Sequence, residues 1–260
     1  MQTEKPKKDG KTKVDEHIFR GAYNYFQNDV NYCTETFNVY RGVTTYTYTF
    51  KAEILSRMEN GEFLKIVVEY VLDTSYSPLD VSITRYLGNQ IIKEVFAVNQ
   101  KENKLRYSFE HNGEISKQEI DVPAKFQIAT PAICTSALSY LSKKYDPTTL
   151  NRYVLLVSPN DFKYVGEVIK KNIFMRAKGN IGDEIIVTDK KLKASAFYMY
   201  ESDDIDKSEE IPICLYLSKH ISIPYLIESG NNTKIEVKYF NKLKTKRFED
   251  LYQEESDEEV

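Results

Sequence analysis

The sequence predicts a mainly β protein: a single large curved antiparallel sheet or half-barrel of about ten to twelve strands wrapped around one central helix. The first observation is that apolar and polar residues alternate over most of the 260-residue chain, with short turns rich in Gly and Asn between the alternating segments. The second is the abundance of 20 Tyr and 13 Phe, which favour strands. The third is that only residues 131–144 change clearly to a helical spacing.

The chain predicts one β-rich domain, residues 14–248, flanked by two disordered tails. Residues 1–13 carry five lysines and little apolar content, and residues 249–260 carry seven acidic residues and no basic one. Such segments cannot bury enough apolar surface to offset the entropy of ordering them. Neither an internal repeat nor a low-complexity linker divides the sequence between them.

The domain begins with an aromatic segment, residues 14–39, that shows little periodicity and fits either a short helix or an irregular arm. From there the alternation is clear: Tyr46, Tyr48, Phe50, Ala52 and Ile54 share one face of a half-buried strand. Further strands are predicted at 63–72, 81–87, 91–98, 104–110 and 115–122, with turns between them. These segments predict an antiparallel meander.

The predicted helix spans residues 131–144, with Thr130 as its N-cap and Pro131 in the first turn. An apolar stripe along one face requires burial against a sheet, so we expect the helix to fill the curve. Strands resume at 153–157, 162–176 with a bulge at Gly166, 184–188, 192–200, 213–217, 223–227 and 235–240.

Sequence motifs for catalysis, metals and cofactors are missing, so we predict a non-enzyme without cofactor or metal. Glycines occur singly in turns, without a phosphate-binding pattern. Ser136 and Ser139 lack the Gly-x-Ser-x-Gly pattern and are interpreted as small or polar helix positions. Three histidines and three cysteines are too far apart in sequence to indicate a metal site or a disulfide framework.

The charge and hydropathy of the chain narrow its partners and location. With 36 basic and 39 acidic residues, nucleic acid is not an expected partner. No window is apolar enough for a transmembrane segment, and the N-terminus lacks a secretion signal. These features predict a cytoplasmic protein.

Four short motifs lie within roughly residues 40–243: YSPL at 76–79, TSALSYL at 135–141, LSK at 217–219 and IPYLI at 223–227, before the Gly230 turn. Together they resemble the DUF3108 family of bacterial envelope-type proteins. The resemblance implies a half-barrel related in shape to lipoprotein carriers and other lipid-handling proteins, and it carries over no catalytic residue. It also implies the cell envelope, whereas the missing export signal indicates the cytoplasm.

The leading functional hypothesis is a non-enzymatic binding protein that holds a lipid or other hydrophobic ligand between the curved sheet and the helix. A fully packed core would explain the same apolar stripes. The alternatives are an interaction module that uses sheet edges and the acidic tail to bind a partner protein, and an enzyme with a dispersed site. The predicted ligand-binding residues are Tyr48, Phe50, Val68, Tyr70, Phe96, Tyr107, Phe109, Ile133, Leu138 and Leu141.

Overall fold

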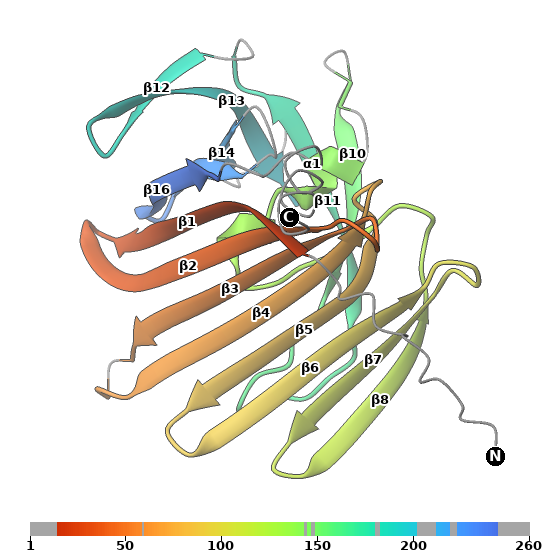
Figure 1. The fold of residues 1–260 in the computed structure, drawn as a ribbon. Helices are drawn as coiled ribbons and strands as arrows, with labels where there is room; N and C mark the ends of the chain where they lie inside the picture. Colours follow the sequence, from red (N-terminus) through yellow and green to blue (C-terminus); the bar gives the residue numbers. More distant parts are fainter. Residues whose placement is uncertain are drawn as a thin grey trace, which may run out of the picture.

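A computed structural model describes residues 15–58, 60–142, 145–146, 149–179, 183–201, 212–218 and 223–243. Its strands form one curved open sheet of 16 strands, in the order β8-β7-β6-β5-β4-β3-β2-β1-β16-β15-β14-β13-β11-β10-β9, with β12 paired to β13 (Figure 1). All pairings are antiparallel except the one between β9 and β10. The mainly β, curved antiparallel fold is therefore confirmed, but the predicted ten to twelve strands are too few.

The sheet contains a long first half and a shorter-stranded second half. The first-half strands are β1 (Asp15–Gln27), β2 (Val30–Gly42), β3 (Thr47–Arg57), β4 (Phe63–Asp73), β5 (Pro78–Leu87), β6 (Gln90–Asn99), β7 (Lys104–His111) and β8 (Glu114–Asp121). The second-half strands are β9 (Gln127–Ile128), β10 (Asn151–Val157), β11 (Ile169–Ala177), β12 (Asp183–Val187), β13 (Lys190–Tyr200), β14 (Ile213–Ser218), β15 (Pro224–Ser229) and β16 (Thr233–Lys242).

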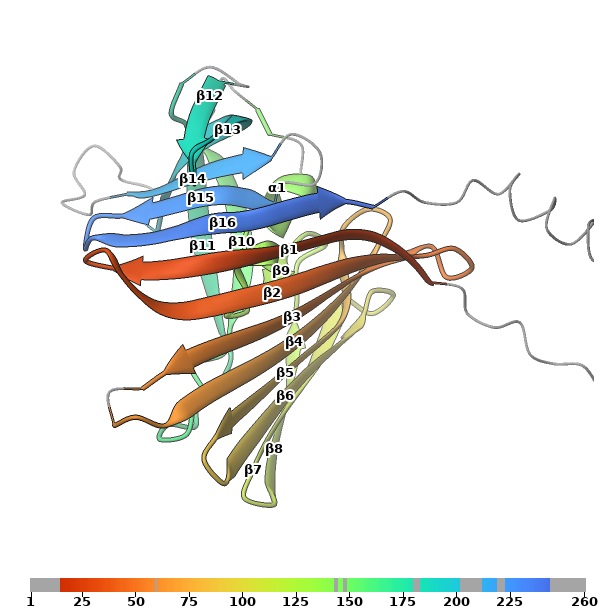
Figure 2. The same cartoon turned by 60° about the vertical axis from the view of Figure 1, so that its left-hand side comes forward.

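The first half is a meander in which each strand pairs with the next, and the second half returns to it through the β1–β16 pair. The second half then turns away from the plane of the first, so that β10 and β11 cross it (Figures 1 and 2). Tyr70 of β4 hydrogen-bonds to Gln127 and Ile128 of β9. This contact places the inner edge of the second half against the concave face of the meander.

Two apolar cores follow from this curvature. The larger one fills the concave face of the meander and includes Val68, Phe96, Ile128 and Leu156. The smaller one packs the second half against the helical segment and includes residues such as Phe197. Burial alternates along β3 and β4, with Phe50, Val68 and their neighbours at i±2 turned inward, as the period-two pattern predicts.

Residues 14–39 were predicted to be a helix or an arm, and this prediction is wrong. From Asp15 onward they form β1 and most of β2, two of the longest strands. The register of β1 shifts between Ala22 and Tyr23 and again near His17, which breaks the alternation that would have identified a strand. Gly21 in β1 leaves room for the Phe37 ring, which would lie only 2.3 Å from an added Cβ atom.

The predicted helix at 131–144 is also shorter than expected. The structure has a 3₁₀ turn, η1 (Ile133–Thr135), and a five-residue helix, α1 (Leu138–Ser142). Thr130 does not cap α1; its Oγ1 accepts a hydrogen bond from the amide of Ala132 at 3.2 Å. Residues 143–144, at the predicted C-terminus of this helix, lie outside the described residues.

Two further local predictions differ from the structure. Gly166 is not a bulge within a strand, because residues 158–168 form a loop and β11 begins only at Ile169. Tyr46 precedes β3 in a turn, with a φ angle of 53° and its side chain exposed. The predicted tails at 1–13 and 249–260 lie outside the described residues.

Candidate functional site

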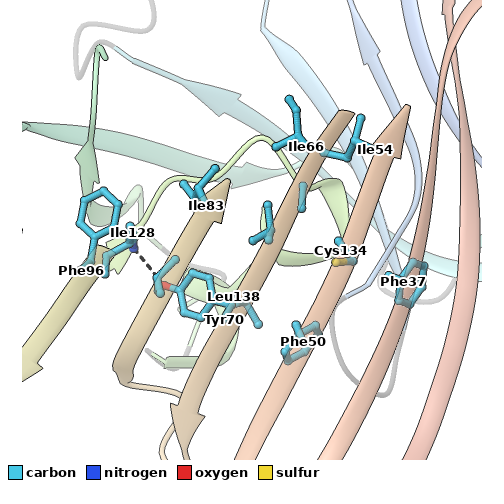
Figure 3. Packing of buried hydrophobic residues seen from close by; sticks show 14 of the residues in the cluster. Phe37, Phe50, Ile54, Ile66, Tyr70, Ile83, Phe96, Ile128, Cys134 and Leu138 are labelled. Carbon is cyan, nitrogen blue, oxygen red and sulfur yellow. Dashed lines mark hydrogen bonds between the residues drawn. The ribbon is translucent and has the colours of Figure 1, made fainter. Parts of the chain in front are cut away.

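The predicted ligand-binding residues all belong to the larger core, on the concave face of the sheet (Figure 3). Seven of them are buried, and the other three, Tyr48, Ile133 and Leu141, are partly buried and pack against the same cluster. Here they contact other protein side chains, among them those of residues 122–138, which lie across the concave face. That these residues bind a ligand stays a prediction.

Segment 122–138 is held by hydrogen bonds from buried polar side chains. The Tyr70 hydroxyl donates to Gln127 Oε1 at 2.7 Å. It also accepts from the amide of Ile128 at 3.0 Å (Figure 3). Gln127 Nε2 in turn donates to the carbonyl oxygen of Tyr76 at 2.6 Å. Because buried polar groups are costly when unpaired, this network fixes one arrangement of the segment.

Glu35 of β2 anchors the same segment at η1. Its fully buried carboxylate accepts hydrogen bonds from the amides of Ile133 at 2.8 Å and Cys134 at 3.0 Å, and from the Tyr25 hydroxyl at 2.5 Å. Burial raises the pKa of this carboxyl above its ordinary value, although the hydrogen bonds from Tyr25 and the two amides oppose the rise. The carboxylate thus replaces an N-cap that the local sequence does not supply.

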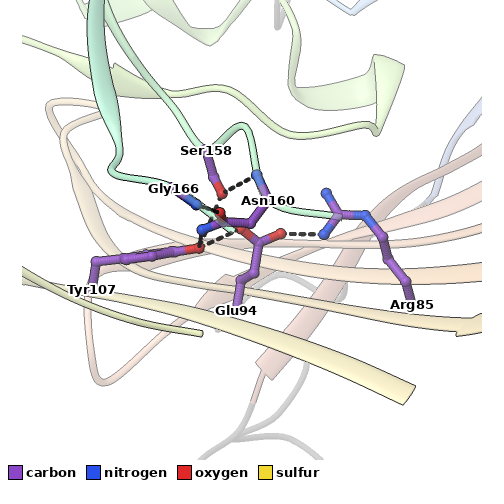
Figure 4. A network of polar contacts seen from close by, with 6 residues as sticks. All are labelled: Arg85, Glu94, Tyr107, Ser158, Asn160 and Gly166. Atoms are coloured by element: carbon purple, nitrogen blue, oxygen red, sulfur yellow. Dashed lines mark hydrogen bonds and ion pairs between the residues drawn. The ribbon is translucent and has the colours of Figure 1, made fainter. Parts of the chain in front are cut away.

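A third network holds the loop 158–168 against the meander (Figure 4). Glu94 of β6 is fully buried, pairs with Arg85 and accepts a hydrogen bond from the Tyr107 hydroxyl at 2.8 Å. Asn160 Nδ2 donates to the same hydroxyl at 2.5 Å, and Asn160 Oδ1 accepts from the amide of Gly166. The buried polar residues Glu94 and Asn160 therefore hold the loop in place.

A cavity of about 460 Å³ lies between β10, α1 and residues 123–127, which lead into β9. It therefore lies between sheet and helix, where a ligand was expected. Its lining residues are Pro123, Ala124, Lys125, Phe126, Gln127, Ser139, Ser142, Arg152, Tyr153 and Val154. Of the predicted ligand-binding residues, none is among them.

The wall of this cavity changes from apolar and buried to charged and exposed. Phe126, Tyr153 and Ser139 are buried, whereas Lys125 and Arg152 are exposed. Among the described residues the Ser139 hydroxyl has no hydrogen-bond partner, although it is buried. A buried polar group left in this state costs about 1–3 kcal/mol.

Two further hollows are less suited to a ligand. One of about 350 Å³ is lined by Leu155, Ile173, Met199 and neighbouring residues. Its rim charges, Lys171 and Glu201, pair with each other at 3.0 Å. The other, of about 390 Å³, lies over the outward-facing side chains of β6–β8, such as Val95.

The titratable groups Glu35, Glu94 and His111 line none of these three hollows. In the described part of the chain, no group of three or more His, Cys, Asp or Glu residues could hold a metal ion. No helix there is long and apolar enough to cross a membrane.

The cavity residues were missed because no local pattern marks them. Ser139 was interpreted as a small or polar helix position, and Lys125 and Arg152 resemble ordinary surface residues in the sequence. They come together only because β9 pairs with β10 and α1 packs beside them. The buried Glu35 was missed because a charged residue in a sequence is ordinarily interpreted as exposed, even where its position in the alternation faces inward.

Comparisons with known proteins support the fold alone. No family model matches the chain, and no curated protein does either. A solved structure, a beta-barrel-like protein of domain of unknown function DUF1849 from Brucella abortus, is similar with a TM-score of 0.50 at 9% identity, covering 88% of this chain and 98% of that one. A DUF1089 family protein from Pseudomonas aeruginosa has a TM-score of 0.46 at 7% identity, covering 71% and 84%.

These findings support a beta-barrel-like fold and do not show the DUF3108 family. The similarity to the DUF1849 structure shows that a protein of experimentally solved structure has a similar fold. Such a fold is compatible with a binding or a structural role.

Proposed function

We propose that this protein is a non-enzymatic binding protein that holds a hydrophobic ligand in the cavity between β10, α1 and residues 123–127. The observation that carries the proposal is a hollow of about 460 Å³ whose accessible lining is largely apolar. Ligand sites in proteins are typically of this size and composition. The proposal does not depend on the DUF3108 resemblance, which stays a prediction.

Rigid surroundings support this choice of cavity. The residues before β9 are held in place by the Gln127 hydrogen bonds, and α1 follows the η1 turn that Glu35 caps. A preformed cavity binds its ligand without the cost of ordering its walls. The hollow over β6–β8 is not enclosed by comparable hydrogen-bonded segments, because it lies on the outward surface of the sheet.

Blocking the mouth of the cavity tests the proposal. Ala124 is exposed and lines the cavity, so Ala124→Trp places a large side chain in the opening with little effect on the core. A suitable probe is dodecanol, followed by calorimetry or by displacement of a fluorescent alkyl dye. We expect one saturable site in the full chain and at least about a tenfold loss of affinity in the variant, because the blocked volume is apolar.

The matched control is Ala97→Trp, the same substitution at an exposed alanine that lines the outward hollow over β6–β8. It should leave dodecanol binding unchanged, and both variants should keep the thermal midpoint of the wild type. Unsaturable binding, or equal affinity in the Ala124→Trp variant, would overturn the proposal.

A second candidate role, as an interaction module, is favoured by the outermost strand β8. No described strand pairs with its second edge, and Ile115 on it is 59% exposed. However, Glu114, Lys117 and Glu119 are also exposed along this strand, and charges on an edge strand oppose the addition of another strand. If removal of residues 249–260 reduced recovery of a protein partner from a pull-down, the acidic tail would take part in such a role.

A further inference from the structure

We propose that the free edge of β8 binds the same edge of a second copy of this chain, antiparallel, so that two sheets join across a two-fold axis. This pairing does not depend on the ligand cavity, and it names a partner for the interaction role of β8. It follows from the open backbone of the strand, the order of its charges and the register that a two-fold axis imposes.

One edge of β8 has no partner among the described strands. The strand lies at one end of the sheet and pairs only with β7 (Figure 1). All its residues are exposed except Gln118 and Ile120, which are partly buried. The backbone amides and carbonyl oxygens of such an edge can accept another strand.

The turn before β8 determines which residues face its free edge. β7 and β8 are joined by Asn112 and Gly113, whose φ angles of 52° and 82° are those of a tight two-residue hairpin. The flanking residues of such a hairpin, His111 and Glu114, form a hydrogen-bonded pair, and every second residue after Glu114 also bonds to β7. The residues between them direct their amides and carbonyl oxygens to the free edge: Ile115, Lys117, Glu119 and Asp121.

Two contacts agree with this alternation. The amide of Val122, at an even position, donates at 2.9 Å to the carbonyl oxygen of Asn103, in the turn that precedes β7. The carbonyl oxygen of Asp121, at an odd position, instead accepts at 3.3 Å from Lys170 Nζ of β11, outside the β7–β8 pair. Lys170 thus contacts the end of the free edge, and the central positions, Lys117 and Glu119, are open to an added strand.

The charges on this edge favour one partner in one register. Charged side chains ordinarily oppose the addition of a strand, but Lys117 and Glu119 carry opposite charges two residues apart. With the two-fold axis at Gln118, Lys117 of each copy lies directly opposite Glu119 of the other. Opposite charges in directly opposed positions stabilise an antiparallel pair.

Neighbouring registers bring like charges together. With the axis at Lys117, this lysine faces its own copy, and with the axis at Glu119, this glutamate does so. An uncharged strand would form neither ion pair. The charges therefore select a second β8 over an unrelated strand.

The contacts within one copy leave both side chains accessible. Lys117 is exposed, and within the described part of the chain it forms no ion pair. Glu119 pairs with Lys104 and lies 3.6 Å from Arg106, but its side chain is still 47% exposed. Because a carboxylate accepts several hydrogen bonds at once, Glu119 can also bind Lys117 of the second copy.

Sedimentation equilibrium of the full chain tests the pairing. One short strand pair is smaller than the interface of a permanent dimer, so we expect a reversible dimer with a Kd of about 10–100 μM. The dimer should weaken as salt is raised, because the Lys117–Glu119 pairs are exposed. A chain that stays monomeric up to about 1 mM would overturn the proposal.

Charge reversal tests the register. Lys117→Glu and Glu119→Lys should each weaken self-association by about tenfold or more, because both place like charges opposite each other. An equimolar mixture of the two variants should form a heterodimer with about the wild-type affinity, since each changed charge then faces its opposite. The control Lys51→Glu alters an exposed ion pair with Glu69 on β3 and β4, and should leave the dimer unchanged.

Ile115→Pro tests the edge without changing any charge. It removes an amide that faces the free edge and leaves the hydrogen bonds to β7 in place, as proline on an edge strand permits. We expect a weaker dimer and an unchanged thermal midpoint.

A dimer that persists in folded Ile115→Pro would use another surface, and the proposal would be overturned. The same holds if the two charge variants keep their thermal midpoints but do not associate when mixed. Dodecanol binding should be the same in Ile115→Pro and the wild type. Failure of the β8 pairing is therefore distinguishable from failure of the ligand cavity, which the Ala124→Trp variant tests.

Discussion

Both halves of the sheet consist of β-strands, but the strands of the first half are more regular in length and in the order of their pairing. Strands β1–β8 have 8 to 13 residues, and each pairs with its chain neighbour. Strands β9–β16 have 2 to 11 residues, and longer segments, 129–150 and 158–168, interrupt them. The cavity that we propose as the binding site belongs to the second half.

The regular first half thus acts as a supporting framework, whereas the cavity that we propose for binding lies in the less regular second half. The meander places continuous rows of large side chains on one face, together with two buried carboxylates that hold incoming segments. The second half packs a smaller core and leaves hollows beside its short strands. Binding sites commonly lie on irregular segments that a regular framework positions.

The largest expected effect compares the two cores. Phe96→Ala in the meander should lower the free energy of unfolding by about 3–5 kcal/mol, since a fully buried ring is lost. Phe197→Ala in the second half should cost about 1 kcal/mol less, because neighbours beside the hollow can relax into the space. Urea unfolding measures both. An equal or larger loss at Phe197 would show that the second half is packed as tightly as the first.

The next effect tests the buried carboxylate of the framework. Glu35→Ala leaves the amides of Ile133 and Cys134 without an acceptor and should cost about 3 kcal/mol or more. The control Glu53→Ala removes a half-exposed carboxylate that pairs with Lys65 on the outer face, and should cost no more than about 1 kcal/mol. Similar losses in the two variants would contradict the anchoring role of Glu35.

A smaller effect is expected at the contact between the halves. Tyr70→Phe removes the hydroxyl that bonds to Gln127 and Ile128, and should lower the free energy of unfolding by about 1–3 kcal/mol. Tyr86→Phe, at an exposed position on β5, serves as the control and should be close to neutral. Hydrogen exchange should also show faster exchange at residues 127–128 in the Tyr70 variant. Unchanged exchange there would mean that this contact does not hold the halves together.

The smallest effect is a pH dependence. Because burial raises the Glu35 pKa, the folded protein binds this proton more tightly than the unfolded chain does. The proton on Glu35 therefore contributes to the free energy of unfolding at pH values below 4.5, the ordinary pKa of this carboxyl. This contribution is lost as the pH rises through the raised pKa of the folded protein. Unfolding free energies of wild type and Glu35→Gln, measured from acidic to neutral pH, should differ in slope. The advantage of the wild type should shrink as the pH rises; an advantage that grows would contradict the raised pKa.

The sequence predicted the elements whose periodicity is unbroken. In β3 and β4 every second side chain faces the core, so Phe50 and Val68 could be placed on one face from the alternation alone. It failed at β1 and β2, where register shifts and the inward Glu35 interrupt the pattern. Here contacts with neighbouring strands stabilise an irregular strand that local preference does not indicate.

By itself the sequence determined the fold class, because alternation along a strand is a local property that burial of one face requires. Only the tertiary structure decided the length of the helical segment, since the Glu35 carboxylate that holds η1 lies about a hundred residues away. The cavity was decided in the same way: Lys125, Ser139 and Arg152 meet through the β9–β10 pairing and the packing of α1. Contacts between segments that are far apart in the sequence produce no periodic pattern, because the contacts of one segment depend on where the other segment lies in the fold.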